Sequence, residues 1–86
     1  MAASLQTWSN TFCREFDRLP PRIQQAIEAK IDDLGTRLDS FPHHRLTGRT
    51  EYRLRVGDYR VLYEFDLSQG RVYLLYVGHR RDIYKR

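Results

Sequence analysis

Three arginines, Arg53, Arg55 and Arg60, occupy polar positions in the stretch EYRLRVGDYRVLYEF, residues 51–65. A guanidinium group presents N–H donors in a planar fork that matches two oxygens of a phosphate. Apolar and polar residues alternate on both sides of Gly57-Asp58, a pair typical of the two-residue turn of a β-hairpin. With that turn, Arg55 stands opposite Arg60 and all three arginines lie on one face.

Like charges placed directly opposite each other destabilise a hairpin, so this pair of arginines needs an explanation. One explanation is an anion site, in which phosphate oxygens accept from the guanidinium groups. The alternative is purely structural: long aliphatic stems keep the charges apart in water, or nearby carboxylates neutralise them. The candidate carboxylates are Glu51, Asp58, Glu64 and Asp82.

The C-terminal segment GHRRDIYKR, residues 78–86, carries further groups of the same chemical kinds. Arg80, Arg81 and Lys85 are cations, Tyr84 has a ring that stacks on a base, and His79 has an imidazole that titrates near neutral pH. If the last strand lies beside the hairpin, we expect these side chains to reach the arginine face. The segment therefore favours an RNA site, with His79 as a candidate acid or base.

The positive charge of the chain is concentrated in its second half. Fifteen Lys and Arg against eleven Asp and Glu give a net charge of +4, of which residues 1–42 contribute −1 and residues 43–86 contribute +5. Such asymmetry points to an anionic partner, either nucleic acid or an acidic protein, although basic residues also serve solubility.

Eighty-six residues predict one domain with a thin core. One cysteine, Cys13, permits no disulfide framework, so a reducing, cytoplasmic setting is expected. The N-terminus lacks the pattern of a signal peptide, and the chain has no apolar run of the ~20 residues that a membrane helix needs. His43 and His44 are adjacent in a polar loop, residues 39–50, and are expected to be solvated rather than to bind a metal.

Residues 4–8 predict a short strand, and Ser9 or Asn10 is expected to cap the helix that follows. Pro20-Pro21 ends that helix and begins a second one, so the two form a helical hairpin. The second helix is expected to pack on the core through one apolar stripe: Ile23, Ala26, Ile27, Ile31, Leu34 and Leu38.

The second half of the chain predicts strands. After the hairpin, residues 66–70 form another turn, and residues 71–77 are apolar on both sides, as in a strand with neighbours on both edges. The expected fold class is α+β: a short N-terminal strand, a helical hairpin and then a curved antiparallel sheet, all in a single domain of residues 1–86.

Residues 52–65 and 76–86, together with this order of elements, resemble the RelE family of bacterial and archaeal toxins within the RelE/ParE superfamily. The resemblance covers essentially the whole chain. It implies a type II toxin that enters the ribosomal A site and cuts mRNA without a metal or other cofactor. It also implies a cognate RelB-like antitoxin and a toxin–antitoxin complex that binds operator DNA to repress its own operon.

By position, the catalytic basic residues that the resemblance implies fall on Arg53, Arg55, Arg60 and Arg80, and the C-terminal tyrosine falls on Tyr84. The best-studied relatives carry lysines in place of Arg53 and Arg55. Because arginine does not lose its proton, these two are expected to clamp phosphates rather than to act as general bases. Arg81 and Lys85 are expected to bind flanking RNA.

Two other functions are compatible with the same fold. A toxin of the ParE kind binds and inhibits DNA gyrase and lacks the arginine and tyrosine set. An inactive relative would serve only to bind an antitoxin or to repress an operon. Substitution of Arg60 discriminates between these readings, because an enzyme would lose cleavage and a gyrase binder would be nearly indifferent.

Overall fold

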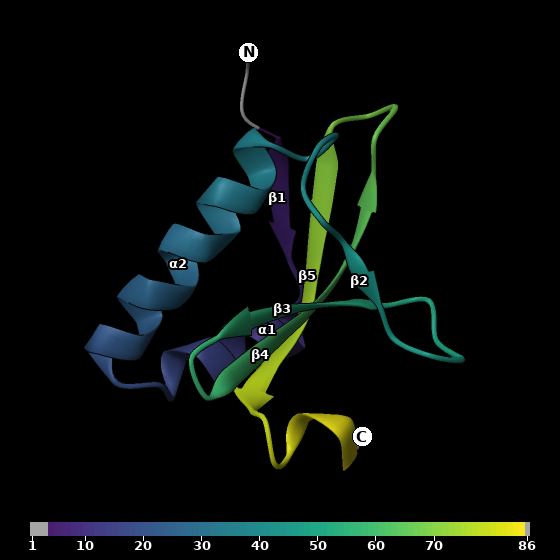
Figure 1. Ribbon diagram of the computed structural model, residues 1–86. Coiled ribbons are helices and arrows are strands. Elements are labelled where there is room, and N and C mark those ends of the chain that lie inside the picture. The colour runs from purple at the N-terminus through teal and green to yellow at the C-terminus, as the bar shows by residue number, and fades with distance from the viewer. Residues whose placement is uncertain (1–3, 86) are drawn as a thin grey trace.

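The computed structural model describes residues 4–85, except for the side chain of Lys85. Two helices, five strands and one 3₁₀ turn follow each other along the chain (Figure 1). The elements are β1 (Leu5–Trp8), α1 (Asn10–Asp17), α2 (Pro21–Thr36), β2 (His44–Arg45), β3 (Tyr52–Val56), β4 (Tyr59–Asp66), β5 (Arg71–His79) and η1 (Ile83–Lys85).

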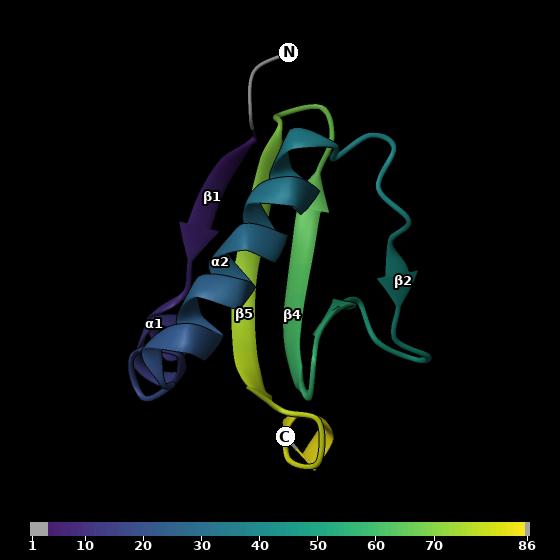
Figure 2. The ribbon, with the colours of Figure 1, turned by 60° about the vertical axis from the view of Figure 1, so that its left-hand side comes forward.

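The five strands form one sheet in the order β1-β5-β4-β3-β2. β5 has a neighbour on each edge, which confirms the prediction of an interior strand. β1 runs parallel to β5, and the other pairs are antiparallel, so the sheet is mixed rather than wholly antiparallel. Figure 2 shows β1 along one side of the sheet and the short β2 on the other side.

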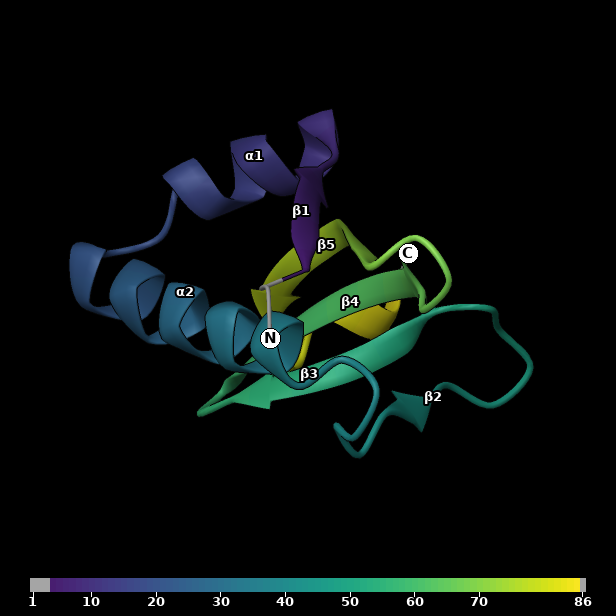
Figure 3. The ribbon, with the colours of Figure 1, turned by 90° about the horizontal axis from the view of Figure 1, so that it is seen from above.

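The two helices cover one face of the sheet (Figure 3), and η1 lies against the opposite face, where Ile83 is next to Gly78. Ser9 caps α1, because its Oγ accepts from the backbone N–H of Phe12 at 3.0 Å. Ile27, Ile31 and Leu34 of α2 are buried in the main core with Phe12, Phe16 and the inward side chains of the strands. The expected stripe on α2 needs two corrections: Ala26 is exposed, and Leu38 is buried but follows the end of the helix at Thr36.

A bulge in β5 changes which of its side chains face the helices. Tyr63 pairs with Leu74 and Leu62 pairs with Tyr76, so Leu75 is the extra residue. As a result Val77 is buried under the helices, whereas Tyr76 and Gly78 lie on the opposite face. Without the bulge these positions would exchange faces.

The face away from the helices carries a small apolar cluster of its own. Leu62 and Ile83 are 0% and 1% exposed, yet neither belongs to the main core. A Cβ built on Gly78 would lie 3.5 Å from Cδ1 of Ile83, which places η1 against β5. Since Leu62 lies one step along this face from Gly78, we infer that Ile83 also covers Leu62.

The expectation of a solvated loop over residues 39–50 is wrong for His43. Its Nδ1 lies 2.6 Å from the hydroxyl of Tyr63, its Nε2 lies 2.8 Å from the carbonyl oxygen of Leu38, and its ring stacks on Phe65 at 3.9 Å. His44 is exposed, but it belongs to β2 rather than to a loop. A histidine between two hydrogen-bonding partners and an aromatic ring is indistinguishable in sequence from a solvated one.

Candidate RNA-binding and catalytic site

The β3–β4 hairpin has the predicted turn and register. Gly57 has a φ of +59°, and the pairs run Val56 with Tyr59, Arg55 with Arg60 and Leu54 with Val61. A glycine of positive φ at the first turn position fits the II′ turn, whose twist matches that of the strands. Arg53, Arg55 and Arg60 therefore share the face away from the helices, which we call the arginine face.

None of the four candidate carboxylates forms an ion pair with these arginines within residues 4–85. Glu51 pairs with Arg49 at 3.0 Å, and that guanidinium holds the pKa of Glu51 below its usual range. Asp58 lies 3.7 Å from Arg80, and Glu64 accepts from the hydroxyl of Thr50 at 2.7 Å. The backbone N–H of Asp82 bonds the carbonyl of His79. Neutralisation by these carboxylates does not explain the cluster.

Arg60 is held in place by the turn that precedes it. Its Nη1 donates to the carbonyl of Gly57 at 2.9 Å and to the carbonyl of Tyr59 at 2.8 Å. These bonds use one guanidinium nitrogen and leave the remaining N–H groups for a ligand. A fixed fork of donors on a sheet face is suited to binding an anion.

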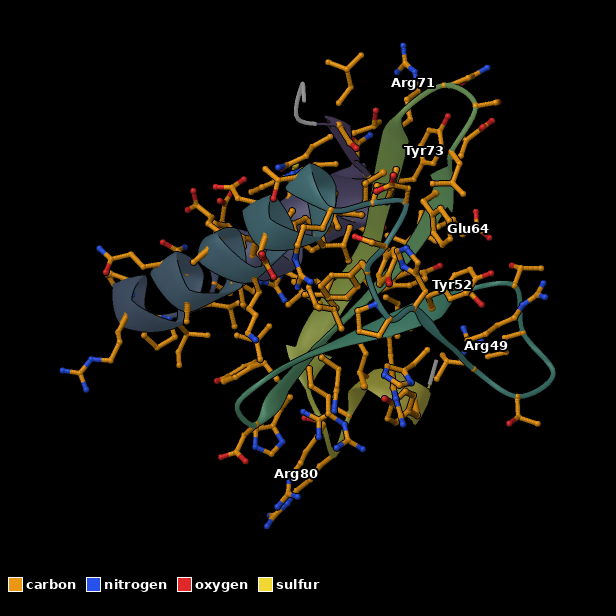
Figure 4. All side chains as sticks on the ribbon, turned by 45° about the horizontal axis from the view of Figure 1, so that its top comes forward. Arg49, Tyr52, Glu64, Arg71, Tyr73 and Arg80 are labelled. Atoms are coloured by element: carbon orange, nitrogen blue, oxygen red, sulfur yellow. The ribbon has the colours of Figure 1, made fainter. Side chains whose placement is uncertain are left out.

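The C-terminal segment brings Arg80 to the same end of the sheet. The backbone N–H of Arg80 donates to the carbonyl of Asp58 at 2.8 Å, which ties this segment to the turn of the hairpin. The side chain of Arg80 is 53% exposed and projects from the end of the sheet opposite Arg71 (Figure 4). Arg80 therefore joins Arg55 and Arg60 around a single turn.

Ile83 and Tyr84 are neighbours in the 3₁₀ turn η1 but differ in their exposure to solvent. Ile83 is buried and anchors η1, and Tyr84, the next residue, is 41% exposed. An anchored turn with an exposed ring beside a cationic surface is suited to stacking on a base. Arg81 is exposed on the segment before η1. The side chain of Lys85 lies outside the described residues.

His79 does not reach the arginine face, contrary to expectation. It pairs with Tyr59, on the side of the sheet that bears the helices, and its ring meets that of Tyr59 edge-on at 5.6 Å. Its Nδ1 accepts from the backbone N–H of Arg81 at 3.2 Å. The face of His79 is set by the bulge at Leu75, since an unbroken register would turn its side chain toward the arginines.

One histidine that the sequence reading did not select lies at the edge of the arginine face. His44 stands opposite Arg53 in the β2–β3 pair, so the two side chains project from the same face. The sequence signal for this strand is weak, because β2 has only two residues. No cluster of three or more His, Cys, Asp or Glu suited to a metal occurs among the described residues, and their helices include none long and apolar enough to span a membrane.

Comparisons with known proteins match most of the length of this chain. The family model described as ParE toxin of type II toxin–antitoxin system, parDE, matches residues 7–84. Toxin RelG of Mycobacterium tuberculosis (strain ATCC 25618 / H37Rv) is 36% identical over 83 residues, which cover 92% of this chain and 93% of the relative.

Solved structures of related proteins have the same fold. A chain of the M. tuberculosis toxin–antitoxin complex RelBE2 superposes with a TM-score of 0.77 at 29% identity, over 95% of this chain and 97% of that one. The isolated E. coli RelE toxin superposes with a TM-score of 0.73 at 18% identity, over 90% of this chain and 84% of that one. The expected α+β fold is confirmed.

Proposed function

The chain belongs to the RelE/ParE family of type II toxin–antitoxin toxins, and from that premise we propose that it is a ribosome-dependent endoribonuclease that cuts mRNA in the A site. The observation that carries the proposal is the set of guanidinium groups around the β3–β4 turn, of which Arg55 and Arg60 have no ion-pair partner among the described residues. A toxin that works only by binding another protein has no need of opposed arginines, which weaken its own hairpin.

In the proposed reaction the 2′-hydroxyl of the RNA attacks the adjacent phosphorus. The bond from phosphorus to the 5′-oxygen breaks, so the products are a 2′,3′-cyclic phosphate and a 5′-hydroxyl. Arg60 and Arg80 bind the scissile phosphate and stabilise the negative charge that grows on its oxygens. Arg53 and Arg55 bind flanking phosphates, and Arg81 and Lys85 bind the RNA beyond them.

The described residues of this site include few groups that can transfer a proton. Because His79 is turned toward the helices, our proposal assigns its role to Tyr84, an exposed residue whose ring can stack on a base and whose hydroxyl can pass a proton. With arginines that stay protonated and no imidazole beside Arg60, catalysis rests on positioning and electrostatic stabilisation. This is the reason to propose that the ribosome, in the cytoplasm, bends the substrate into line.

A cognate antitoxin of the RelB kind is the proposed partner. The matched M. tuberculosis structure is a toxin–antitoxin complex named RelBE2, and another match is the intact E. coli RelBE complex. An acidic segment of such a protein would complement the net charge of +5 in residues 43–86. The toxin–antitoxin complex is further proposed to bind operator DNA.

The rival function is inhibition of DNA gyrase, which we weigh because the family model that matches residues 7–84 is described as ParE toxin. A cleavage assay with programmed ribosomes and end-labelled mRNA separates the two. We expect A-site cuts from the wild-type protein, a loss of about 100-fold or more in Arg60→Ala, and no loss in Arg22→Ala, which removes an exposed arginine from α2. If the mRNA stays intact both with and without ribosomes, the proposed nuclease activity is refuted and inhibition of gyrase supercoiling becomes the next assay.

A further inference from the structure

A groove of about 290 Å³ runs beside the outer edge of β3, at the margin of the arginine face. Arg53 and Arg55 line it from the strand, with Leu54 between them, and Lys30 of α2 lines it from the other side. Phe41 and Pro42 form its wall. We call this the β3-edge groove.

The strand edge inside the groove is open. β2 pairs with β3 only at Tyr52 and Arg53, so residues 54–56 have no strand on their outer side among the described residues. An open edge presents backbone N–H and C=O groups in alternation. Those groups are donors and acceptors for the polar edge of a ligand.

The charge in the groove is of one sign. Lys30, Arg53 and Arg55 line it, His44 adds an imidazole, and its lining includes no carboxylate. Within residues 4–85 none of these three cations forms an ion pair. The groove therefore favours a ligand that carries negative charge.

The apolar wall is already formed. The backbone N–H of Phe41 donates to the carbonyl of Arg37 at 2.7 Å, and the Arg37 guanidinium lies 5.1 Å from the centre of the Phe41 ring. The N–H of His43 donates to the carbonyl of Phe41 at 2.9 Å. Phe41 is held by residues that precede and follow it in the chain, so this wall loses little conformational entropy when a ligand binds.

We propose that the β3-edge groove binds a nucleotide of single-stranded RNA adjacent to the phosphates on the arginine face, an inference that rests on the proposed function. The base packs on Phe41 and Pro42 and is read by backbone groups of β3, while Lys30 binds the phosphate. An acidic peptide would also match the charge. RNA is favoured because Arg53 and Arg55 belong to both surfaces, so one strand crosses from the cutting site into the groove without a gap.

The test measures binding rather than cutting, in protein that carries Arg60→Ala so that the RNA stays intact. A short fluorescein-labelled oligoribonucleotide is titrated at several salt concentrations against this parent and against versions that also carry Lys30→Ala or Arg22→Ala. Both added changes remove one exposed cation from α2, but only Lys30 lines the groove. We expect Lys30→Ala to weaken binding on the order of fivefold and to reduce the salt slope by about 0.7, the value for one phosphate of a single strand. Arg22→Ala is expected to match the parent.

Three results would overturn the proposal. The first is equal affinity of the Lys30→Ala and Arg22→Ala proteins for the oligoribonucleotide, and the second is no binding by the parent at low salt. The third is a Lys30→Ala protein that binds the oligoribonucleotide as the parent does but binds a Glu-rich peptide, titrated in parallel, more weakly. The last result would assign the groove to a protein partner. Binding is measured without cleavage, so the two proposals can fail separately. If no mRNA is cut on the ribosome but Lys30→Ala weakens RNA binding as expected, the proposed nuclease activity is refuted and the groove remains an RNA-binding site.

Discussion

The backbone N–H of Arg80 donates to the carbonyl oxygen of Asp58 at 2.8 Å, and this single bond joins the end of β5 to the turn of the β3–β4 hairpin. The two side chains meet as well, with Nε of Arg80 3.7 Å from Oδ1 of Asp58, and both are largely exposed. The backbone bond sets the position of Arg80, and the ion pair places a carboxylate beside its guanidinium.

The first prediction separates these two contacts. Asp58→Asn keeps the backbone bond and removes the carboxylate that competes with a phosphate for Arg80. We expect the free energy of unfolding in urea to change by less than ~1 kcal/mol, because the ion pair is exposed and loose. Affinity for a short oligoribonucleotide is expected to rise. A lower affinity in Asp58→Asn would show that the carboxylate organises the site instead of opposing the ligand.

The second prediction concerns the anchor of η1. Ile83→Ala removes the buried side chain that lies against Gly78 and, by our inference, covers Leu62, so we expect a loss of at least about 2 kcal/mol in unfolding free energy. Cleavage is expected to fall further than stability accounts for, because Tyr84 loses its fixed position.

Gly78→Ala is the matched control for Ile83→Ala. A Cβ at Gly78 would meet Cδ1 of Ile83 at 3.5 Å, an ordinary van der Waals distance, so the substitution should leave both cleavage and stability nearly unchanged. Full cleavage by a folded Ile83→Ala protein would refute the anchoring role.

The arginine face was predictable because turn chemistry and strand alternation are local. Gly57-Asp58 fixed the turn, the turn fixed the register, and the register put Arg53, Arg55 and Arg60 on one face. The helices were predictable for similar reasons, since Ser9 and Pro21 mark their starts and buried residues recur at helical spacing.

The bulge at Leu75 and the contacts of His43 were not predictable from such patterns. Residues 71–77 are apolar on both sides, so their alternation carries no sign of an extra residue, and the bulge turned His79 away from the arginines. The contact of His43 with Tyr63 joins segments that only the tertiary fold brings together. The parallel pairing of β1 with β5 is equally non-local.

The third prediction tests how that bulge is held. Oγ of Ser9 accepts from the N–H of Phe12 and donates to the carbonyl of Leu75 at 2.8 Å. One hydroxyl therefore caps α1 and also hydrogen-bonds the backbone of the extra residue in the bulge. Ser9→Ala loses both bonds, and we expect a decrease of about 2 kcal/mol in unfolding free energy. Asn10→Ala, at an exposed neighbouring position, should cost less than ~0.5 kcal/mol. Equal losses in these two variants would mean that the hydroxyl contributes nothing beyond local helix propensity.

The fourth prediction concerns the hydrogen-bonded chain from Leu38 through His43 to Tyr63. A carbonyl oxygen only accepts, so Nε2–H of His43 donates to Leu38, and the bare Nδ1 accepts from the hydroxyl of Tyr63. Tyr63→Phe leaves Nδ1 without its donor, and we expect a cost of about 1–2 kcal/mol at neutral pH.

The same tyrosine makes stability depend on pH in the alkaline range. Burial raises the pKa of Tyr63 above its ordinary value of 10.0, so the folded protein keeps the phenolic proton under conditions where the unfolded chain releases it. This contribution is fully present below pH 10 and is lost as the pH rises above that value, by up to about 1.4 kcal/mol for each pH unit. Urea unfolding followed from pH 8 to pH 11 should show a shallower alkaline decline for Tyr63→Phe than for the wild type. Tyr84→Phe, which changes an exposed ring, should retain the wild-type decline; identical slopes in all three proteins would exclude Tyr63 as its source.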